Sequence, residues 1–132
     1  MRQRFIRLAS ILHAAEKQAL LKALGDLNAI IGVLVGHAME SQTDPVKIYT
    51  VGLNTSRCLM AVGDIITSWL LLRQADIAAE KLPNAGKDTD FYTGKVAAAK
   101  FFVHNNLPHI TADRKIVEAT NGCIMELPES AF

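Results

Sequence analysis

Apolar residues recur every three or four positions along most of this chain, which is the spacing of one face of an α-helix. In the first long segment the steps run four, three, four, three and four, so one face is predicted to carry the core residues Leu20, Leu24, Leu27, Ile31, Leu34 and Ala38. The same spacing continues toward the N-terminus without a proline, so we expect this helix to begin near Arg2. Gly32 and Gly36 lie four residues apart, which predicts close approach of a neighbouring helix backbone.

A second long helix is predicted after the polar break at Ser41–Pro45. The Asp44 carboxylate can cap free backbone amides, and Pro45 suits the first helical turn, so the helix begins here. It ends at Leu82, because Pro83 disfavours helical geometry in the residue before it. Its apolar stripe consists of Val46, Tyr49, Leu53, Met60, Val62, Ile66, Trp69 and Leu70.

The polar stretch Pro83–Asp88 is predicted to form a loop between two helical hairpins. A third helix follows, capped by Asp88, Thr89 or Asp90, and it ends at Asn105–Pro108. Its apolar face is predicted to carry Phe91, Val96, Ala98, Ala99, Phe102 and Val103.

A weaker fourth helix is predicted from about Pro108 to Thr120, where Asn121–Gly122 supplies the C-terminal stop. No segment alternates apolar and polar residues in the manner of a strand, so no sheet is predicted. The pattern as a whole predicts one domain over residues 1–132. Its fold class is all-α, an antiparallel helical bundle of about four helices, two of them long.

Composition limits the classes of function. Half of the 132 residues are hydrophobic, which is enough to fill one core of ordinary size. Lysine and arginine number 14 against 13 acidic residues, so no net field would draw the chain to nucleic acid or to an anionic membrane. The mean hydropathy of +0.19 is high for a small water-soluble domain, which indicates that a partner outside this chain covers some apolar faces.

We expect a cytoplasmic protein without a membrane span. Leu27–Met39 holds about 13 residues and Met60–Leu72 contains Asp64, so neither matches the roughly 20 apolar residues of a span. Cys58 and Cys123 have neither metal-ligand spacing nor the density of a disulfide framework. The N-terminal arginines are not followed by the uninterrupted apolar run of a signal peptide.

No catalytic, cofactor-binding or metal-ligating residue is predicted. Carboxylate-bridged metal pairs in helical bundles need Glu-x-x-His motifs, which this chain lacks, and its histidines are expected at surface or capping positions. The glutamates are expected on solvated helix faces and in the tail, at Glu16, Glu40, Glu80, Glu118, Glu126 and Glu129.

Three other charged residues, Asp64, Lys95 and Lys100, are candidates for contact with a substrate or a phosphate group. Asp64 has apolar neighbours, and burial of an unpaired carboxylate is costly, so we expect it to face solvent or to pair with Arg57 or Lys47. Lys95 and Lys100 flank the third predicted helix. We interpret both as solvated lysines, and contact with a phosphate of CoA or FAD in a neighbouring subunit is the alternative.

The segment from Trp69 to Pro108 has the residue order of a known family. After Trp69, Arg73 and Ala75, the polar loop is followed by Asp90-Phe91-Tyr92, Gly94-Lys95, Ala97, Ala98, Phe101, Phe102 and Leu107-Pro108. This order resembles the extra C-terminal domain of large bacterial acyl-CoA dehydrogenases, the kind similar to methylmercaptopropionyl-CoA dehydrogenases. The ending, with Asn121-Gly122 and Leu127-Pro128-Glu129 before Phe132, is similar to the way those enzymes finish.

The resemblance implies that this chain is the C-terminal part of a larger flavoenzyme, with Met1 not at that enzyme's start. Such enzymes remove hydrogens from the α and β carbons of an acyl-CoA thioester and pass the hydride to FAD. Their catalytic glutamate and flavin-binding residues would lie in the preceding domains, and the Gln-x-x-Gly-Gly stretch of the catalytic bundle is absent here. The domain itself would pack on those domains, support a homo-oligomer such as a dimer, or cover the active-site entrance.

Two alternatives stay open. A free-standing helical bundle would bind an acyl chain or a partner helix between its hairpins, and the reading frame upstream of Met1 distinguishes this possibility from a dehydrogenase domain. An amphipathic face that touches a membrane is the second alternative, and liposome binding at low salt tests it.

Overall fold

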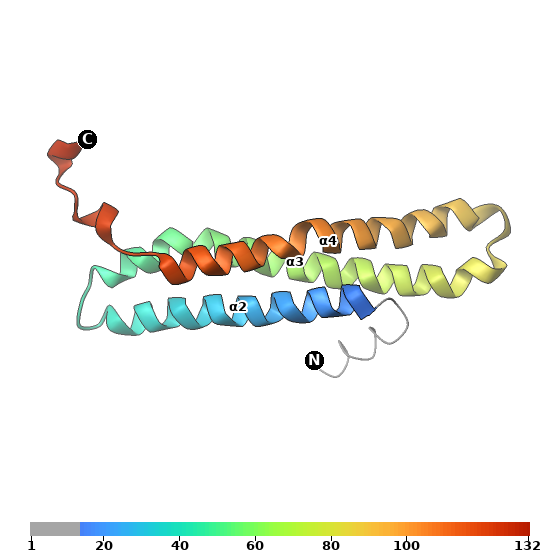
Figure 1. Cartoon of the computed structure of the whole chain (residues 1–132), viewed down its shortest axis with the longest axis horizontal. Helices are drawn as coiled ribbons and strands as arrows, with labels where there is room; N and C mark the ends of the chain where they lie inside the picture. The colour runs from blue at the N-terminus through green and yellow to red at the C-terminus, as the bar shows by residue number, and fades with distance from the viewer. Residues whose placement is uncertain (1–13) are drawn as a thin grey trace.

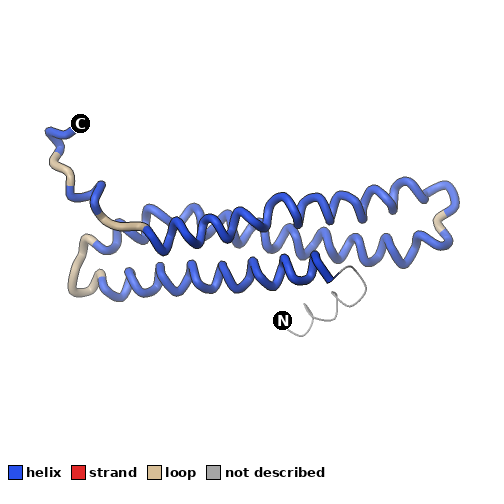
Figure 2. Tube along the Cα trace, in the orientation of Figure 1, coloured by secondary structure: helices blue, strands red, loops and turns tan. Residues whose placement is uncertain are grey.

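The helical spacing of the sequence gives three long helices. The computed structural model describes residues 14–132, and within them α2 (Ala14–Glu40), α3 (Lys47–Lys81) and α4 (Thr89–Ala119) lie side by side (Figure 1). Of these, α2 and α4 run in one direction and α3 runs in the other. Short connections join them, and no strand occurs in this range (Figure 2). The all-α class is therefore confirmed, whereas about four helices is wrong for the described part. The predicted helix start near Arg2 lies outside the described residues.

The ends of α3 lie within two residues of the predicted start at Pro45 and the predicted end at Leu82. The Asp44 carboxylate accepts a hydrogen bond from the Val46 amide at 3.3 Å, and regular helix begins at Lys47. The helix then runs for 35 residues without a break. Pro83 lies in a short 3-10 turn, Leu82–Asn84, and a second turn, Gly86–Asp88, leads into α4. Gly86 has a φ of 52°, a left-handed conformation that glycine adopts without steric cost.

The third and fourth predicted helices are one continuous helix, α4, with Pro108 inside it. An interior proline removes one backbone hydrogen bond at a cost of about 3 kcal/mol, which is why the sequence pattern favoured an end here. Pro108 is exposed, whereas its neighbours Leu107 and Ile110 are 2% and 1% exposed. Burial on both sides of the proline holds the two halves in line, because each such side chain contributes about 1.5–3 kcal/mol.

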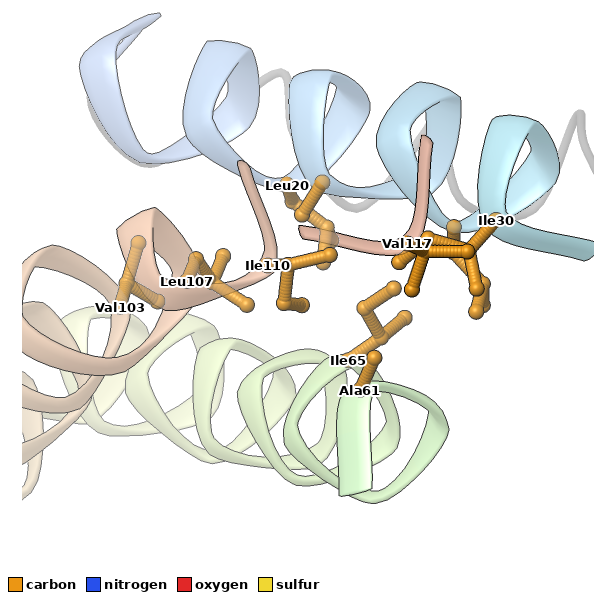
Figure 3. Close-up of a cluster of buried hydrophobic side chains, with 10 residues drawn as sticks. Leu20, Ile30, Ala61, Ile65, Val103, Leu107, Ile110 and Val117 are labelled. Atoms are coloured by element: carbon orange, nitrogen blue, oxygen red, sulfur yellow. The ribbon is translucent and has the colours of Figure 1, made fainter. Parts of the chain in front are cut away.

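The core lies where the three helices face one another (Figure 3). Branched aliphatic side chains from α2 and α4 fill most of it, and α3 contributes smaller ones. Its buried members are Leu20, Ala23, Leu27, Ile30, Ala61, Ile65, Val103, Leu107, Ile110 and Val117.

The predicted core face of α2 is only partly correct. Leu20 and Leu27 are buried as expected, but Ile31 is 40% exposed and Ala38 is exposed. Ile30 takes the central position and is fully buried. The prediction combined two apolar stripes that lie about 100° apart around the helix. The stripe with Leu20, Leu27 and Ile30 faces the core, and the stripe with Ile31 does not.

For α3 the predicted stripe is mostly wrong. Trp69 and Val62 pack against the core, but the other large apolar side chains of the stripe are exposed, namely Val46, Tyr49, Leu53, Met60, Ile66 and Leu70. The buried face instead carries Ala61, Ser68 and Ala75 together with Ile65. Small side chains let α3 approach its neighbours closely, so hydrophobicity alone pointed to the other side of the helix.

On α4 the predicted face is partly correct. Ala99 and Val103 are buried, whereas Phe91 is exposed. Among residues 14–132 the predicted close approach at Gly32 and Gly36 does not occur, because no neighbouring element comes within 4 Å of where their Cβ atoms would be.

Two helical segments are long and apolar enough to cross a bilayer by length and composition alone. Within residues 14–132, Ala15–Glu40 contains an 18-residue window with a mean hydropathy of 1.6 and Lys47–Asn84 contains one with 1.2, so counting uninterrupted apolar residues underestimated both. Only 28% and 17% of these windows are buried. Core helices of soluble proteins can also be this long and apolar. The low buried shares show that much of the apolar surface of these two helices is not covered within the described residues.

Gly63→Ala is expected to raise the free energy of unfolding of this chain by about 1 kcal/mol, because alanine favours the helix over glycine. No atom lies within 4 Å of the added Cβ. Urea unfolding followed by circular dichroism measures the change. Ala61→Gly is the matched control, and it should lower the stability by at least about 1 kcal/mol because Ala61 is buried. A loss of stability in Gly63→Ala would contradict the open space at this position.

Candidate functional site

Polar side chains inside the bundle lie mainly between α4 and its two neighbours. Asp26 on α2 is 5% exposed and accepts hydrogen bonds from Lys22 Nζ at 2.8 Å, Thr111 Oγ1 at 2.6 Å and an Arg114 guanidinium nitrogen at 3.1 Å. Lys22 also donates to Thr111, and Arg114 Nε donates to Glu118 at 2.7 Å. These contacts hold α2 in one register against α4.

Two opposing effects act on the Asp26 carboxyl. Burial raises its pKa, but the hydrogen bonds from Lys22, Thr111 and Arg114 favour the ionised form more strongly, so the pKa lies below its ordinary value. Hydrogen bonds to Glu118 and Asp26 raise the pKa of Arg114. The group is therefore a set of fixed charges at neutral pH, which suits an interhelical tie and not proton transfer.

Glu16 is a second buried carboxylate, and its predicted place on a solvated face is wrong. It is 4% exposed, and its Oε1 lies 2.8 Å from His104 Nε2 on α4. Because α2 and α4 run in the same direction, the first turn of α2 meets the middle of α4, where His104 supplies a partner. The prediction of His104 as a surface or capping residue missed this pairing.

The two cations expected near Asp64 have other partners. Arg57 donates to Asp113 on α4 at 3.2 Å, and Lys47 Nζ lies 3.8 Å from Glu40 Oε2 at the end of α2. Neither forms an ion pair with Asp64 among the described residues. Asp64 itself is half-buried.

Asn54 forms a further tie between α3 and α4. Its side-chain amide is buried and donates to Thr120 Oγ1 at 3.1 Å and to the Thr50 carbonyl at 3.2 Å. This contact joins the beginning of α3 to the end of α4.

Asp76 on α3 is a further buried carboxylate, and its pKa is raised. It is 6% exposed, and its Oδ1 has no hydrogen-bond partner within the part of the chain that the structure describes. Burial raises its pKa, and the charge of Glu80 one turn away raises it further. Sequence reasoning missed both Asp76 and Asp26. The only sign of either residue in the sequence was an acid with apolar neighbours. The same pattern occurs at solvent-exposed positions of a helix, so it did not indicate burial.

The hollow between α2 and α4 is not built like an FAD site. It is open, has a volume of about 590 Å³ and is lined by Lys22, Gly25, Asp26, Thr111, Arg114, Lys115 and Glu118. A flavin ring packs against aromatic or large aliphatic side chains, and none of the lining residues is of that kind.

Metal ligands and the two candidate lysines give no further site. Within residues 14–132 no three His, Cys, Asp or Glu side chains gather as metal ligands. Lys95 donates to Gln74 at 3.3 Å and lies 5.5 Å from the centre of the Phe91 ring, and Lys100 is half-buried. Lys95 therefore contacts other side chains, and neither lysine is fully exposed.

The fold and its polar ties define a helical packing domain whose buried charges hold helices together. Residues 3–128 match the family described as "Acetyl-CoA dehydrogenase C-terminal like". The chain belongs to this family, and it is a C-terminal domain of the acyl-CoA dehydrogenase type.

The relatives are much longer proteins. The chain is 44% identical over 119 residues to the broad-specificity linear acyl-CoA dehydrogenase FadE5 of Mycobacterium tuberculosis, an alignment that covers 89% of this chain and 20% of that protein. Two butyryl-CoA dehydrogenases of Syntrophomonas wolfei are 36% and 31% identical, over 62% and 90% of this chain and over 14% and 19% of their own lengths. The chain therefore spans about a fifth or less of the curated relatives it matches.

Asp26→Asn is expected to lower the free energy of unfolding at neutral pH by about 1–2 kcal/mol, because hydrogen bonds to a charged acceptor are weakened. The folded pKa of Asp26 lies below the ordinary value of about 3.9. Its stabilisation is thus present above that value and is lost as the pH falls through the folded pKa. Urea unfolding at neutral and acidic pH should show the variant and wild type converging in acid, while Glu129→Gln in the exposed tail changes neither.

Asp76→Asn should act in the opposite direction. The folded pKa of Asp76 is raised, so ionisation costs the folded state stability as the pH rises above about 4. Removing the charge is expected to stabilise the chain at neutral pH by on the order of 1 kcal/mol, with the gain vanishing in acid. The same unfolding series measures it, and a destabilised variant at neutral pH would show that the charge of Asp76 has a partner.

Proposed function

We propose that this chain is the non-catalytic C-terminal domain of an FAD-dependent acyl-CoA dehydrogenase of the cytoplasm. It serves packing, dimerisation or covering of the active site in that enzyme. The observation that carries the proposal is the 44% identity to FadE5 over nearly the whole chain but only 20% of that relative. The chemistry of the enzyme then belongs to the other four-fifths of the polypeptide.

The parent reaction is the α,β-dehydrogenation of an acyl-CoA thioester. FAD supplies the redox chemistry when bound, by accepting the hydride. The base that removes the α-proton lies in the preceding domains, together with the flavin-binding residues. Acyl-CoA and a second copy of the enzyme are therefore partners of the whole polypeptide.

The buried carboxylates of this domain support a structural role. Asp26 is held ionised by three donors, and Glu16 is bonded to His104, so both are tied to α4. A general base must lie within hydrogen-bond reach of its substrate proton and have a pKa near the working pH. The pKa of Asp26 is lowered, which moves it away from the neutral pH at which a general base works.

A second function is favoured by the exposed apolar side chains of α2 and α3. A free-standing bundle would use them to bind an acyl chain or a partner helix. The gene distinguishes the two functions, because a reading frame that continues upstream of Met1 into a flavin-binding dehydrogenase supports the first, and a stop codon with a ribosome-binding site supports the second.

The purified chain is expected to contain no flavin and to show no acyl-CoA dehydrogenase activity, because it does not supply the walls of a flavin site. Absorption spectroscopy of the purified protein and a dye-reduction assay with acyl-CoA measure both properties. The complete polypeptide, prepared in parallel, should be yellow and active. A stoichiometric flavin spectrum in the chain alone would refute the non-catalytic role.

A further inference from the structure

The side of α3 that faces away from the core carries a second apolar stripe. Ile48, Leu59, Ile66, Leu70 and Ile77 are separated by combinations of three- and four-residue steps, which place them on one side of the helix, and each is more than two-fifths exposed. The small residues of the buried stripe occupy the opposite side of the helix. A helix that is apolar on all sides is typical of the centre of a larger assembly or of a membrane.

Gly52 and Gly63 interleave with this second stripe, each four residues from one of its members and on the same side of the helix. Nothing lies within 4 Å of a Cβ built on either glycine. Each glycine lowers helix stability, and no neighbour within residues 14–132 requires its missing side chain. The two glycines leave shallow hollows in a stripe of large side chains, into which side chains of another helix can fit.

Helix α2 extends the same surface. Leu21, Ile31, Val35 and Met39 share one side of α2 and are all exposed. This side is opposite Asp26, which bonds α4, just as the α3 stripe is opposite Asn54 and Arg57. Since α2 and α3 are neighbours, the two stripes form one face, here termed the α2–α3 outer face: Leu21, Ile31, Val35, Met39, Ile48, Gly52, Leu59, Gly63, Ile66, Leu70 and Ile77.

The charge distribution suits a desolvated interface. The residues named as the α2–α3 outer face are uncharged, and Lys22, Asp26 and Arg57 on the same helices bond toward α4. Interface centres are depleted of charged residues in the same way.

Charged residues bound the face: Lys17 lies one turn before Leu21, and Arg73 and Lys81 lie on the stripe side of α3 toward its C-terminal end, so its uncharged part on α3 runs from Ile48 to Leu70. The α3 stripe is about 45 Å long, and with α2 beside it the face is on the order of the 800 Å² that each partner gives to a standard interface.

We propose that a helix from the dehydrogenase body of the same polypeptide packs lengthwise along the α2–α3 outer face. The inference rests on the proposed function, because the matched relatives hold about four-fifths of their length outside this domain. A body joined covalently to the domain is present at a high effective concentration, about millimolar for a short linker, and outcompetes a free second copy for the same surface. A helix packed along this face completes a four-helix arrangement.

Hydroxyl-radical footprinting of this chain and of the complete polypeptide tests the docking. Met39, Leu59 and Ile66 should be oxidised readily in the chain and several-fold more slowly in the complete polypeptide. Phe101, which is 70% exposed on α4, should react equally in both and serves as the internal control. Flavin content and activity are measured on the same sample of complete polypeptide.

Two substitutions separate docking from folding. Gly63→Leu fills one hollow, so the chain alone should keep its melting temperature or gain a little, while the complete polypeptide should show a separate lower melting transition. Leu59→Lys should act in the same way, because its side chain is exposed in the chain. The matched control, Phe101→Lys, should leave the complete polypeptide unchanged. Faster proteolysis between the body and the domain reports release directly.

The outcomes are distinguishable. A flavin-loaded, active polypeptide in which Leu59 is oxidised as fast as in the chain alone refutes the docking and leaves the proposed function standing. A complete polypeptide without flavin or activity refutes the proposed function. If the chain alone dimerises in sedimentation and Leu59 is protected in footprinting, the face binds a second copy. If the chain co-sediments with phosphatidylcholine vesicles, the face binds lipid. Either result overturns the proposal.

Discussion

The rotation of α2 and α3 about their own axes is the constraint on which the rest of the structure depends. Both helices carry apolar side chains on more than one side, so hydrophobic burial alone does not decide which side faces inward. The polar contacts to α4 decide it. Asp26 bonds Thr111 and Arg114, and Arg57 bonds Asp113, so the inner sides are fixed and the remaining apolar sides are turned outward.

The sequence predicts the helical period, the class of fold and most helix ends, because these depend on local spacing and on residues such as Asp44, Pro83 and Gly86. It fails where the outcome depends on residues far along the chain. Pro108 ends a helix by local rules, yet burial of Leu107 and Ile110 carries α4 through it. The inner face of α3 was missed because Ala61 and Ser68 are less hydrophobic than the exposed Leu59 and Ile66.

The candidate site shows the same limit. The absence of sequence motifs for catalysis could be noted from the residues alone, and the residue order from Trp69 to Pro108 identified the family correctly. The buried positions of Glu16, Asp26 and Asp76 could not be predicted, because a carboxylate is placed inside only when its partner or its surroundings are known. Asp26 and Asp76 illustrate the two cases, since donors lower the pKa of the first and burial raises that of the second.

The ties between α2 and α4 have a consequence for the order of folding. They join residues 85 to 89 positions apart, as in Thr111 to Asp26 and Lys22 to Thr111. Contacts of such long sequence separation close large loops and form late. The α2–α3 and α3–α4 pairs are each joined by a short connection and can form before the α2–α4 ties close, so the final rotation of α2 is set last. Before α4 packs against α2 and α3, either apolar stripe of α2 can pack against α3 with a similar gain in hydrophobic burial.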